Sequence, residues 1–142
     1  MDMARAESFR TGDAGHAPAA LPHGQLRLLG TEALAEPAFT AAWERLAARA
    51  AEPNPFFEPW FLLPALRQWG ASEGVVIKAW FREGRLAGLL PVVRSAAYYG
   101  HGVTHAKGWL HPNAFCGVPL IAAGHEEAFW RAMLTHFDRR AR

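Results

Sequence analysis

Two apolar runs joined by a short polar segment, within residues 75–94, constrain the fold of this chain more than any other feature. The runs cover residues 75–81 and 86–93, and the segment at 82–85 between them contains Gly84. This pattern predicts an antiparallel β-hairpin. Because both runs are apolar nearly throughout rather than alternating, we expect a sheet that helices cover on both faces.

Pro91 lies inside the second of these runs. Proline has no N–H group to donate, so the hydrogen-bond ladder must be interrupted there, at an edge or at a bulge. Gly88, three residues earlier, allows a bend or the close approach of another part of the chain.

Length and composition limit the class of protein. The chain has 142 residues, enough for one domain with a buried core, and 51% hydrophobic with 20% charged residues is ordinary for a soluble globular protein. The formal net charge is only +2, and Arg is spread along the chain apart from the tail at residues 139–142. A nucleic-acid-binding protein needs a basic face, so we expect no nucleic-acid partner.

Three further features bear on the compartment. Cys116 is the only cysteine, so an internal disulfide cannot form and a reducing compartment is expected. No apolar run approaches the roughly 18 residues of a membrane span. Charged residues such as Arg5 and Glu7 stand where an export signal needs its apolar region. We therefore expect a cytoplasmic protein without a membrane span.

The N-terminal part contains a leader and the first elements of the domain. Residues 1–24 have no periodicity and are expected to form a disordered leader, so that the domain covers residues 25–142. Residues 25–29 alternate and predict a strand, and residues 31–51 predict one amphipathic helix. Its apolar stripe consists of Phe39, Trp43, Leu46 and Ala50.

A second helical pattern begins after the prolines of residues 53–55, at Glu58, and stops at Gly70. Pro64 interrupts this pattern because it removes a hydrogen bond from a helix interior. Either the helix is kinked at Pro64, or a short turn precedes a helix that starts there.

The C-terminal part predicts shorter elements. In order they are a loop at 95–106, a short strand at 107–111, a turn-rich connection at 112–117, a strand at 118–122, and a helix that opens at Gly124 and His125. The last helix has an apolar stripe of Phe129, Met133 and Phe137, widened by Trp130 and Leu134. The predicted fold is therefore an α+β layer architecture with a mostly antiparallel sheet.

Four stretches of sequence together resemble a known family. They are the helix with Trp43 and Leu46, Asn-Pro-Phe-Phe-Glu-Pro at 54–59, Gly-Arg-Leu-Ala-Gly-Leu-Leu-Pro at 84–91, and Gly-Val-Pro-Leu-Ile at 117–121. On these residues the chain resembles the N-terminal part of the CelD/BcsL-like proteins, which belong to the GCN5-related N-acetyltransferase (GNAT) superfamily. The resemblance spans roughly residues 25 to 138 and implies a GNAT-like lobe with a mostly antiparallel central sheet flanked by helices.

The resemblance also implies a function. Family members look like two acetyltransferase-type lobes in tandem, with acetyl-CoA held by the second lobe. This chain would then be an incomplete, N-terminal lobe that shapes the acceptor groove of an acyl-CoA-dependent N-acyltransferase. Acetyl-CoA or another acyl-CoA would be the co-substrate without binding to this chain alone. The expected partner is a second GNAT lobe or another copy of the chain. The alternatives are a non-catalytic docking module and a truncated product without independent activity.

The superfamily's pyrophosphate signature, Arg/Gln-x-x-Gly-x-Gly/Ala between a strand and a helix, is matched only in part. Residues 85–90 have its Arg and its first Gly, but Leu90 replaces the second small residue and the run continues into a strand. Because the signature works only in its structural context, we expect no cofactor loop here.

Candidate site residues gather after the predicted strand at 107–111. Trp109, His111, Asn113 and Phe115 are polar and aromatic and occupy a connection at a strand end, where binding sites often lie. They are our first candidates for binding an acyl acceptor. The alternative is a loop packed by its own aromatic side chains. No catalytic base can be assigned, because Glu58 and His111 are supported only by residue type.

The chain also contains residues of the types that bind a metal or act as a nucleophile. The residues suitable for a tetrahedral zinc site are His101, His105, His111 and Cys116. Their spacing matches no common ligand pattern, so we interpret them as loop residues and expect no metal. Cys116 is expected to be buried and inert, since a nucleophile would need a base and an orienting group.

Overall fold

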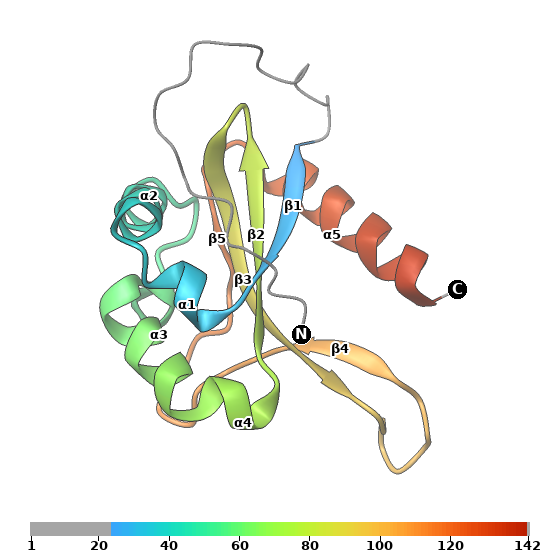
Figure 1. The fold of residues 1–142 in the computed structure, drawn as a ribbon. Helices are drawn as coiled ribbons and strands as arrows, with labels where there is room; N and C mark the ends of the chain where they lie inside the picture. The colour runs from blue at the N-terminus through green and yellow to red at the C-terminus, as the bar shows by residue number, and fades with distance from the viewer. Residues whose placement is uncertain (1–23, 142) are drawn as a thin grey trace, which may run out of the picture.

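The computed structural model describes residues 24–141, which form a five-stranded antiparallel sheet with helices on both faces (Figure 1). The predicted α+β class is confirmed, whereas the predicted leader lies outside the described residues except for Gly24. The elements in chain order are β1 (Gln25–Leu29), α1 (Thr31–Leu34), α2 (Pro37–Ala48), η1 (Pro55–Phe57), α3 (Pro59–Ala65), η2 (Leu66–Gly70), α4 (Ala71–Glu73), β2 (Val76–Arg82), β3 (Arg85–Ser95), β4 (His105–Gly108), β5 (Leu120–Ile121) and α5 (Glu126–Ala141).

The predicted hairpin is confirmed as β2 and β3, the centre of the sheet. Glu83 and Gly84 join the two strands with positive φ angles of 50° and 73°. Two consecutive positive φ angles define the type I′ turn, whose twist suits a two-residue hairpin. The strands follow the order β1-β2-β3-β4, and β5 pairs with β3 on the same edge as β4.

Pro91 sits where the outer edge of β3 changes partners. Along its inner edge β3 pairs with β2 without a break at Pro91, which lies opposite Ile77. The Pro91 carbonyl accepts a hydrogen bond from the Trp109 N–H at 2.9 Å, so the polar groups of Pro91 face the other side. On that side β5 pairs as far as Leu89 and β4 pairs from Val92 onward. The ladder is therefore interrupted at Pro91 as predicted, and the missing N–H falls in the gap.

Helices cover both faces of the sheet, as the unbroken apolar strands predict. Helices α1 to α4 lie on one face and α5 lies on the other (Figure 1). On the first face Trp43 is fully buried and donates from Nε1 to the Phe57 carbonyl at 2.8 Å. On the second face the Trp80 and Phe129 rings meet edge to face, with their centroids 6.0 Å apart. Both faces thus contribute aromatic side chains to the core.

The predicted helix at residues 31–51 is two helices, so that prediction is wrong in detail. Helix α1 ends at Leu34, and α2 begins with Pro37 at its first position. Glu36 is extended, with ψ at 131°, because the ring of a following proline disfavours the helical conformation. Three members of the predicted stripe, Phe39, Trp43 and Leu46, are buried as expected.

The second helical region starts at Pro59, which excludes a helix starting at Pro64. Pro64 lies in the last turn of α3, and the chain continues through a π-helical turn, η2, into α4. A π-helical turn accommodates a disturbed hydrogen-bond ladder. The predicted stop at Gly70 is wrong. The region ends at Gly74, whose φ of 68° provides the left-handed cap.

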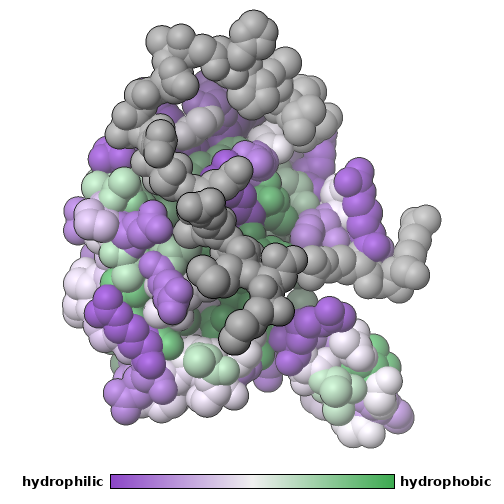
Figure 2. All heavy atoms as spheres, in the orientation of Figure 1, coloured by the Kyte–Doolittle hydropathy of each residue, from purple (hydrophilic) through white to green (hydrophobic). Residues whose placement is uncertain are grey.

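The loop predicted at 95–106 is confirmed for residues 96–104, which connect β3 to β4 and contain a tight turn. Tyr98 and His101 form an antiparallel bridge around Tyr99 and Gly100, both with positive φ angles. The following strand, β4, begins at His105, two residues before the predicted start. The tip of the β3–β4 hairpin projects from the body of the domain (Figure 1, Figure 2).

The end of the chain largely follows the prediction. Strand β5 is confirmed but only two residues long. Helix α5 is confirmed, with Phe129 and Met133 fully buried. Trp130 and Leu134 are exposed, so they do not widen the buried stripe as predicted.

Gly88 lets α5 approach the sheet closely. A Cβ atom at Gly88 would overlap the ring of Phe129, whereas a Cβ atom at Gly108 in β4 would meet nothing within 4 Å. We expect Gly88→Ala to lower the free energy of unfolding by about 1–3 kcal/mol, because overpacking a close contact forces the helix outward. Gly108→Ala should change it by less than about 0.5 kcal/mol. Urea denaturation of both variants measures the difference. Equal stability would contradict the close packing.

Candidate functional site

Asn54 holds two distant segments of the chain together. It is buried, and its side-chain oxygen accepts a hydrogen bond from the Phe56 N–H at 3.1 Å. Its amide nitrogen donates to the carbonyls of Cys116 at 3.1 Å and Val118 at 2.7 Å. The entry to η1 and the connection between β4 and β5 are therefore fastened to one side chain, which caps η1 as well.

The side chain of His111, which belongs to this connection, lies in an aromatic cage. It is buried, and its ring centroid lies 4.5 Å from that of Trp69, 5.6 Å from that of Phe61 and 6.4 Å from that of Trp109. Its Nδ1 accepts a hydrogen bond from the Asn113 N–H at 3.0 Å, so a neutral ring carries its proton on Nε2. In this arrangement neither ring nitrogen can take a proton from an amine. The geometry therefore favours a structural role for His111 over that of a catalytic base.

Trp109, the first residue of this connection, holds it against the sheet and the helical layer. It is buried, and its Nε1 donates to the carboxylate of Glu73 at 2.5 Å. Its backbone N–H donates to Pro91, as described above. Trp109 thus ties the connection to both α4 and β3, and it is too deeply buried to offer a face to a ligand.

A group of aromatic rings, which we call the aromatic surface, lies over His111; Trp60 and Phe115 in it are exposed, whereas Phe56 and Phe61 are partly buried. The aromatic surface consists of Phe56, Trp60, Phe61 and Phe115, which meet edge to face in sequence with centroids 5.2 to 5.9 Å apart. Phe115 is 88% exposed and Trp60 66% exposed. Such large exposed aromatic side chains in one group are a feature of recognition surfaces.

Glu58 adds a negative charge beside the aromatic surface. Its carboxylate accepts a hydrogen bond from Trp60 Nε1 at 2.8 Å. Aromatic faces attract cations through their quadrupole, and a carboxylate does so through its charge. The surface therefore suits a ligand with a protonated amino group and an apolar body.

The four predicted site residues do not form one surface. Phe115 belongs to the aromatic surface, and Asn113 is exposed on the connection. The side chains of Trp109 and His111 are buried, so the interpretation as a loop packed by its own aromatic side chains applies to these two. Three further members of the aromatic surface, Phe56, Trp60 and Phe61, are absent from the predicted site. Their signal was the adjacent aromatic pairs within residues 56–61.

The other candidates are not assembled into sites. Among the described residues, no three or more His, Cys, Asp or Glu side chains come close enough to hold a metal ion. Cys116 is partly exposed, so its predicted burial is wrong, and it is the backbone carbonyl that Asn54 engages. Residues 85–90 are extended within β3 and form no loop before a helix.

Comparison of the chain with models of known protein families, with curated proteins and with solved structures found no match. No helix in the described part of the chain is both long enough and apolar enough to cross a membrane.

Asn54 can be tested by a substitution that keeps its shape. Asn54→Asp replaces the donating amide nitrogen with an oxygen that faces two carbonyl groups. We expect a loss of about 2–4 kcal/mol in the free energy of unfolding, because buried polar groups lose their partners. Asn113→Asp, on the exposed part of the connection, is the control and should change it by less than about 0.5 kcal/mol. Hydrogen exchange at residues 112–118 should accelerate only in Asn54→Asp; unchanged exchange would contradict the role of Asn54.

Proposed function

We propose that this domain is the acceptor-binding lobe of an acyl-CoA-dependent N-acyltransferase of the GNAT type. In the reaction, the unprotonated acceptor nitrogen attacks the thioester carbonyl. A C–N bond forms, the C–S bond breaks, and the proton released by the nitrogen ends on the departing thiolate. The role of this domain is to hold the acceptor, whereas a second lobe holds the acyl-CoA.

The aromatic surface carries this proposal. Amine acceptors are cations before they react, and Trp60 with Glu58 offers an aromatic face and a carboxylate side by side. The segments that carry the surface are fastened by Asn54 and by Trp109, so the rings are held in place before a ligand arrives. A pre-organised surface loses less entropy on binding.

The extended conformation of residues 85–90 supports placing the acyl-CoA on another lobe. A pyrophosphate site needs several backbone N–H groups that converge on one point, usually at a helix N-terminus. Within β3, the N–H groups of these residues alternate between the two edges of the strand.

Non-catalytic docking is the second candidate function, and the exposure of Phe115 favours it. A Phe side chain that is 88% exposed is characteristic of a residue that is buried in a complex. In that case the aromatic surface would bind a partner chain directly rather than a small acceptor.

Calorimetry separates the two candidates. Acetyl-CoA is titrated into the purified chain, alone and mixed with the product of an adjacent reading frame that encodes a second lobe. We expect heat of binding only in the mixture. Binding to the chain alone would refute the assignment of acyl-CoA to a second lobe. A stable complex that binds neither acetyl-CoA nor an amine would favour docking.

The acceptor role predicts a preference for amines at the aromatic surface. NMR titration with phenethylamine should shift the Trp60 indole signal, and 2-phenylethanol, which lacks the charge, should bind more weakly. We expect Trp60→Ala to weaken amine binding by about 3- to 30-fold, the range of a cation–π contact. Glu58→Gln should remove the preference for the amine.

Two variants control this experiment. Tyr99→Ala removes another exposed aromatic ring at the tip of the β3–β4 hairpin, and Glu44→Gln removes an exposed carboxylate from α2. Both should bind phenethylamine as the unchanged chain does. An equal loss in Tyr99→Ala and Trp60→Ala would show that binding is not specific to the aromatic surface.

A further inference from the structure

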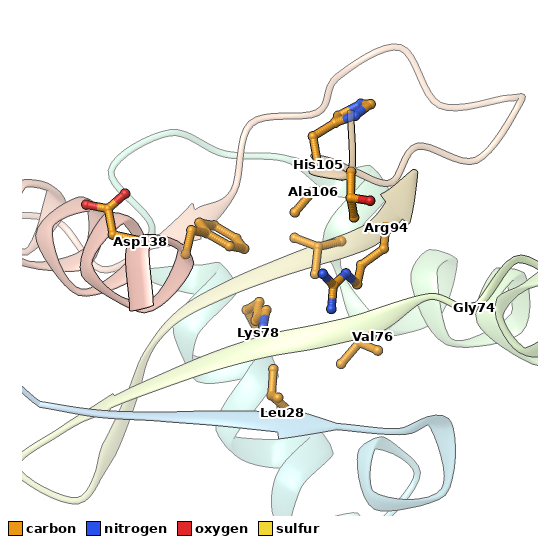
Figure 3. A pocket seen from close by; sticks show the side chains of 11 residues that line it. Leu28, Gly74, Val76, Lys78, Arg94, His105, Ala106 and Asp138 are labelled. Carbon is orange, nitrogen blue, oxygen red and sulfur yellow. The ribbon is translucent and has the colours of Figure 1, made fainter. Parts of the chain in front are cut away.

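A cavity lies on the α5 face of the sheet, which is the face opposite α3 and the aromatic surface. It has a volume of about 360 Å³ and lies between the sheet, β4 and the end of α5 (Figure 3). A cavity of this size is large enough for a small organic molecule. Because it is on the other face, a ligand of this cavity does not depend on the acyltransferase proposal.

The cavity exists because the described part of α5 covers only part of its face of the sheet. Near the start of the helix, Trp80 of β2 is fully buried and packs against Phe129. Alternate residues of a strand share a face, so Val76 lies on the same face as Trp80. At that end of β2, Val76 is 37% exposed, and Leu28 of the neighbouring β1 is 40% exposed. The helix therefore covers one end of the strands and leaves a hollow over the other.

The floor of the cavity is apolar across three neighbouring strands. It consists of Leu28 of β1, Val76 of β2 and Val92 of β3, and Val76 pairs with Val92 in the ladder. Phe137 of α5 and Ala106 of β4 complete the apolar lining. In Figure 3, Leu28 and Val76 lie below the cavity and Ala106 lies above it. Water in such a cavity finds few hydrogen-bond partners, so an apolar molecule that displaces it gains affinity.

Lys78 also lines the cavity, but its ammonium group is engaged with α5. Its Nζ lies 2.9 Å from Nε2 of His136 and 5.5 Å from the centroid of the Phe137 ring. The other two charged side chains of the lining, Arg94 and Asp138, are exposed and keep their hydration. A charged group of a ligand would lose hydration against the apolar floor, which is costly. The cavity therefore suits an uncharged ligand.

We propose that this cavity binds an uncharged, largely apolar small molecule, whose body packs against Leu28, Val92 and Phe137. Apolar surface leaves water on both sides of this contact, and that burial is the driving force for binding. A single polar group on the ligand, such as a hydroxyl, lies at the edge of the cavity beside the exposed Thr104, where it keeps its hydrogen bonds to water. The ligand class is thus that of medium-chain alcohols.

A series of alcohols tests the proposal. 1-Octanol is titrated into the whole chain, and the methyl NMR signals of Val76 and Val92 report occupation of the cavity. We expect saturable shifts, and an affinity about tenfold higher than that of 1-hexanol, because each buried CH₂ group contributes about fourfold. 1,8-Octanediol should bind at least about threefold more weakly than 1-octanol, since its second hydroxyl has to leave water. No shift with 1-octanol, or equal affinity for the diol, would overturn the proposal.

Matched variants locate the binding site. Ala106 and Lys107 are exposed neighbours on β4, and only Ala106 lines the cavity. Ala106→Trp should fill the cavity and weaken 1-octanol binding about tenfold or more, whereas Lys107→Trp places the same ring on the other face of the strand and should leave binding unchanged. Equal effects of these two variants would refute the site.

A second pair of variants keeps the volume of the side chain nearly unchanged. Val76→Thr puts a hydroxyl group into the apolar floor, and we expect it to weaken 1-octanol binding about threefold or more. Val103→Thr makes the same change at an exposed position in the β3–β4 hairpin, outside the cavity lining, and should have no effect. Equal affinities of Val76→Thr and Val103→Thr would refute the site even if Ala106→Trp failed to fold.

Discussion

The partnership of β3 with three other strands is the constraint on which the rest of this structure depends. One edge of β3 is filled by β2 along most of its length, and the other is divided between β5 and β4. Gly88 permits α5 to pack against one face, while Pro91 marks the division on the outer edge. Because a central strand is paired on both edges, a change at these two residues affects every layer of the domain.

The division at Pro91 also helps to position the aromatic surface. Strands β4 and β5 follow the same edge of β3 and are connected by residues 109–119, which leave the sheet where β3 has no partner. Asn54 then fastens this connection to the helical layer. Phe115 of the connection is therefore brought beside the rings of η1 and α3 by the irregular pairing at Pro91 and by the buried amide of Asn54.

Features of the fold that depend on local sequence patterns could be predicted from the sequence. The hairpin, the covered sheet and the interruption at Pro91 follow from apolar runs and from the chemistry of proline, and all three are present. The break before Pro37 follows from a local rule too, since proline suits the first turn of a helix and disfavours the helical conformation in the residue before it. The burial of His111 depends on rings about 40 to 50 positions away, and the contacts of Asn54 on carbonyls about 60 positions away, which no local pattern reveals.

The connection between β4 and β5 has both ends anchored on one strand. This separates the stability of its backbone from the variability of its side chains, two properties that often conflict in proteins. Pairing with β3 fixes where the connection leaves and rejoins the sheet, whatever residues lie between. Asn54 binds backbone carbonyls there, so most side-chain identities in the segment do not affect that fastening. Exposed positions such as Phe115 are thus free to diverge under selection for a new ligand with little loss of stability.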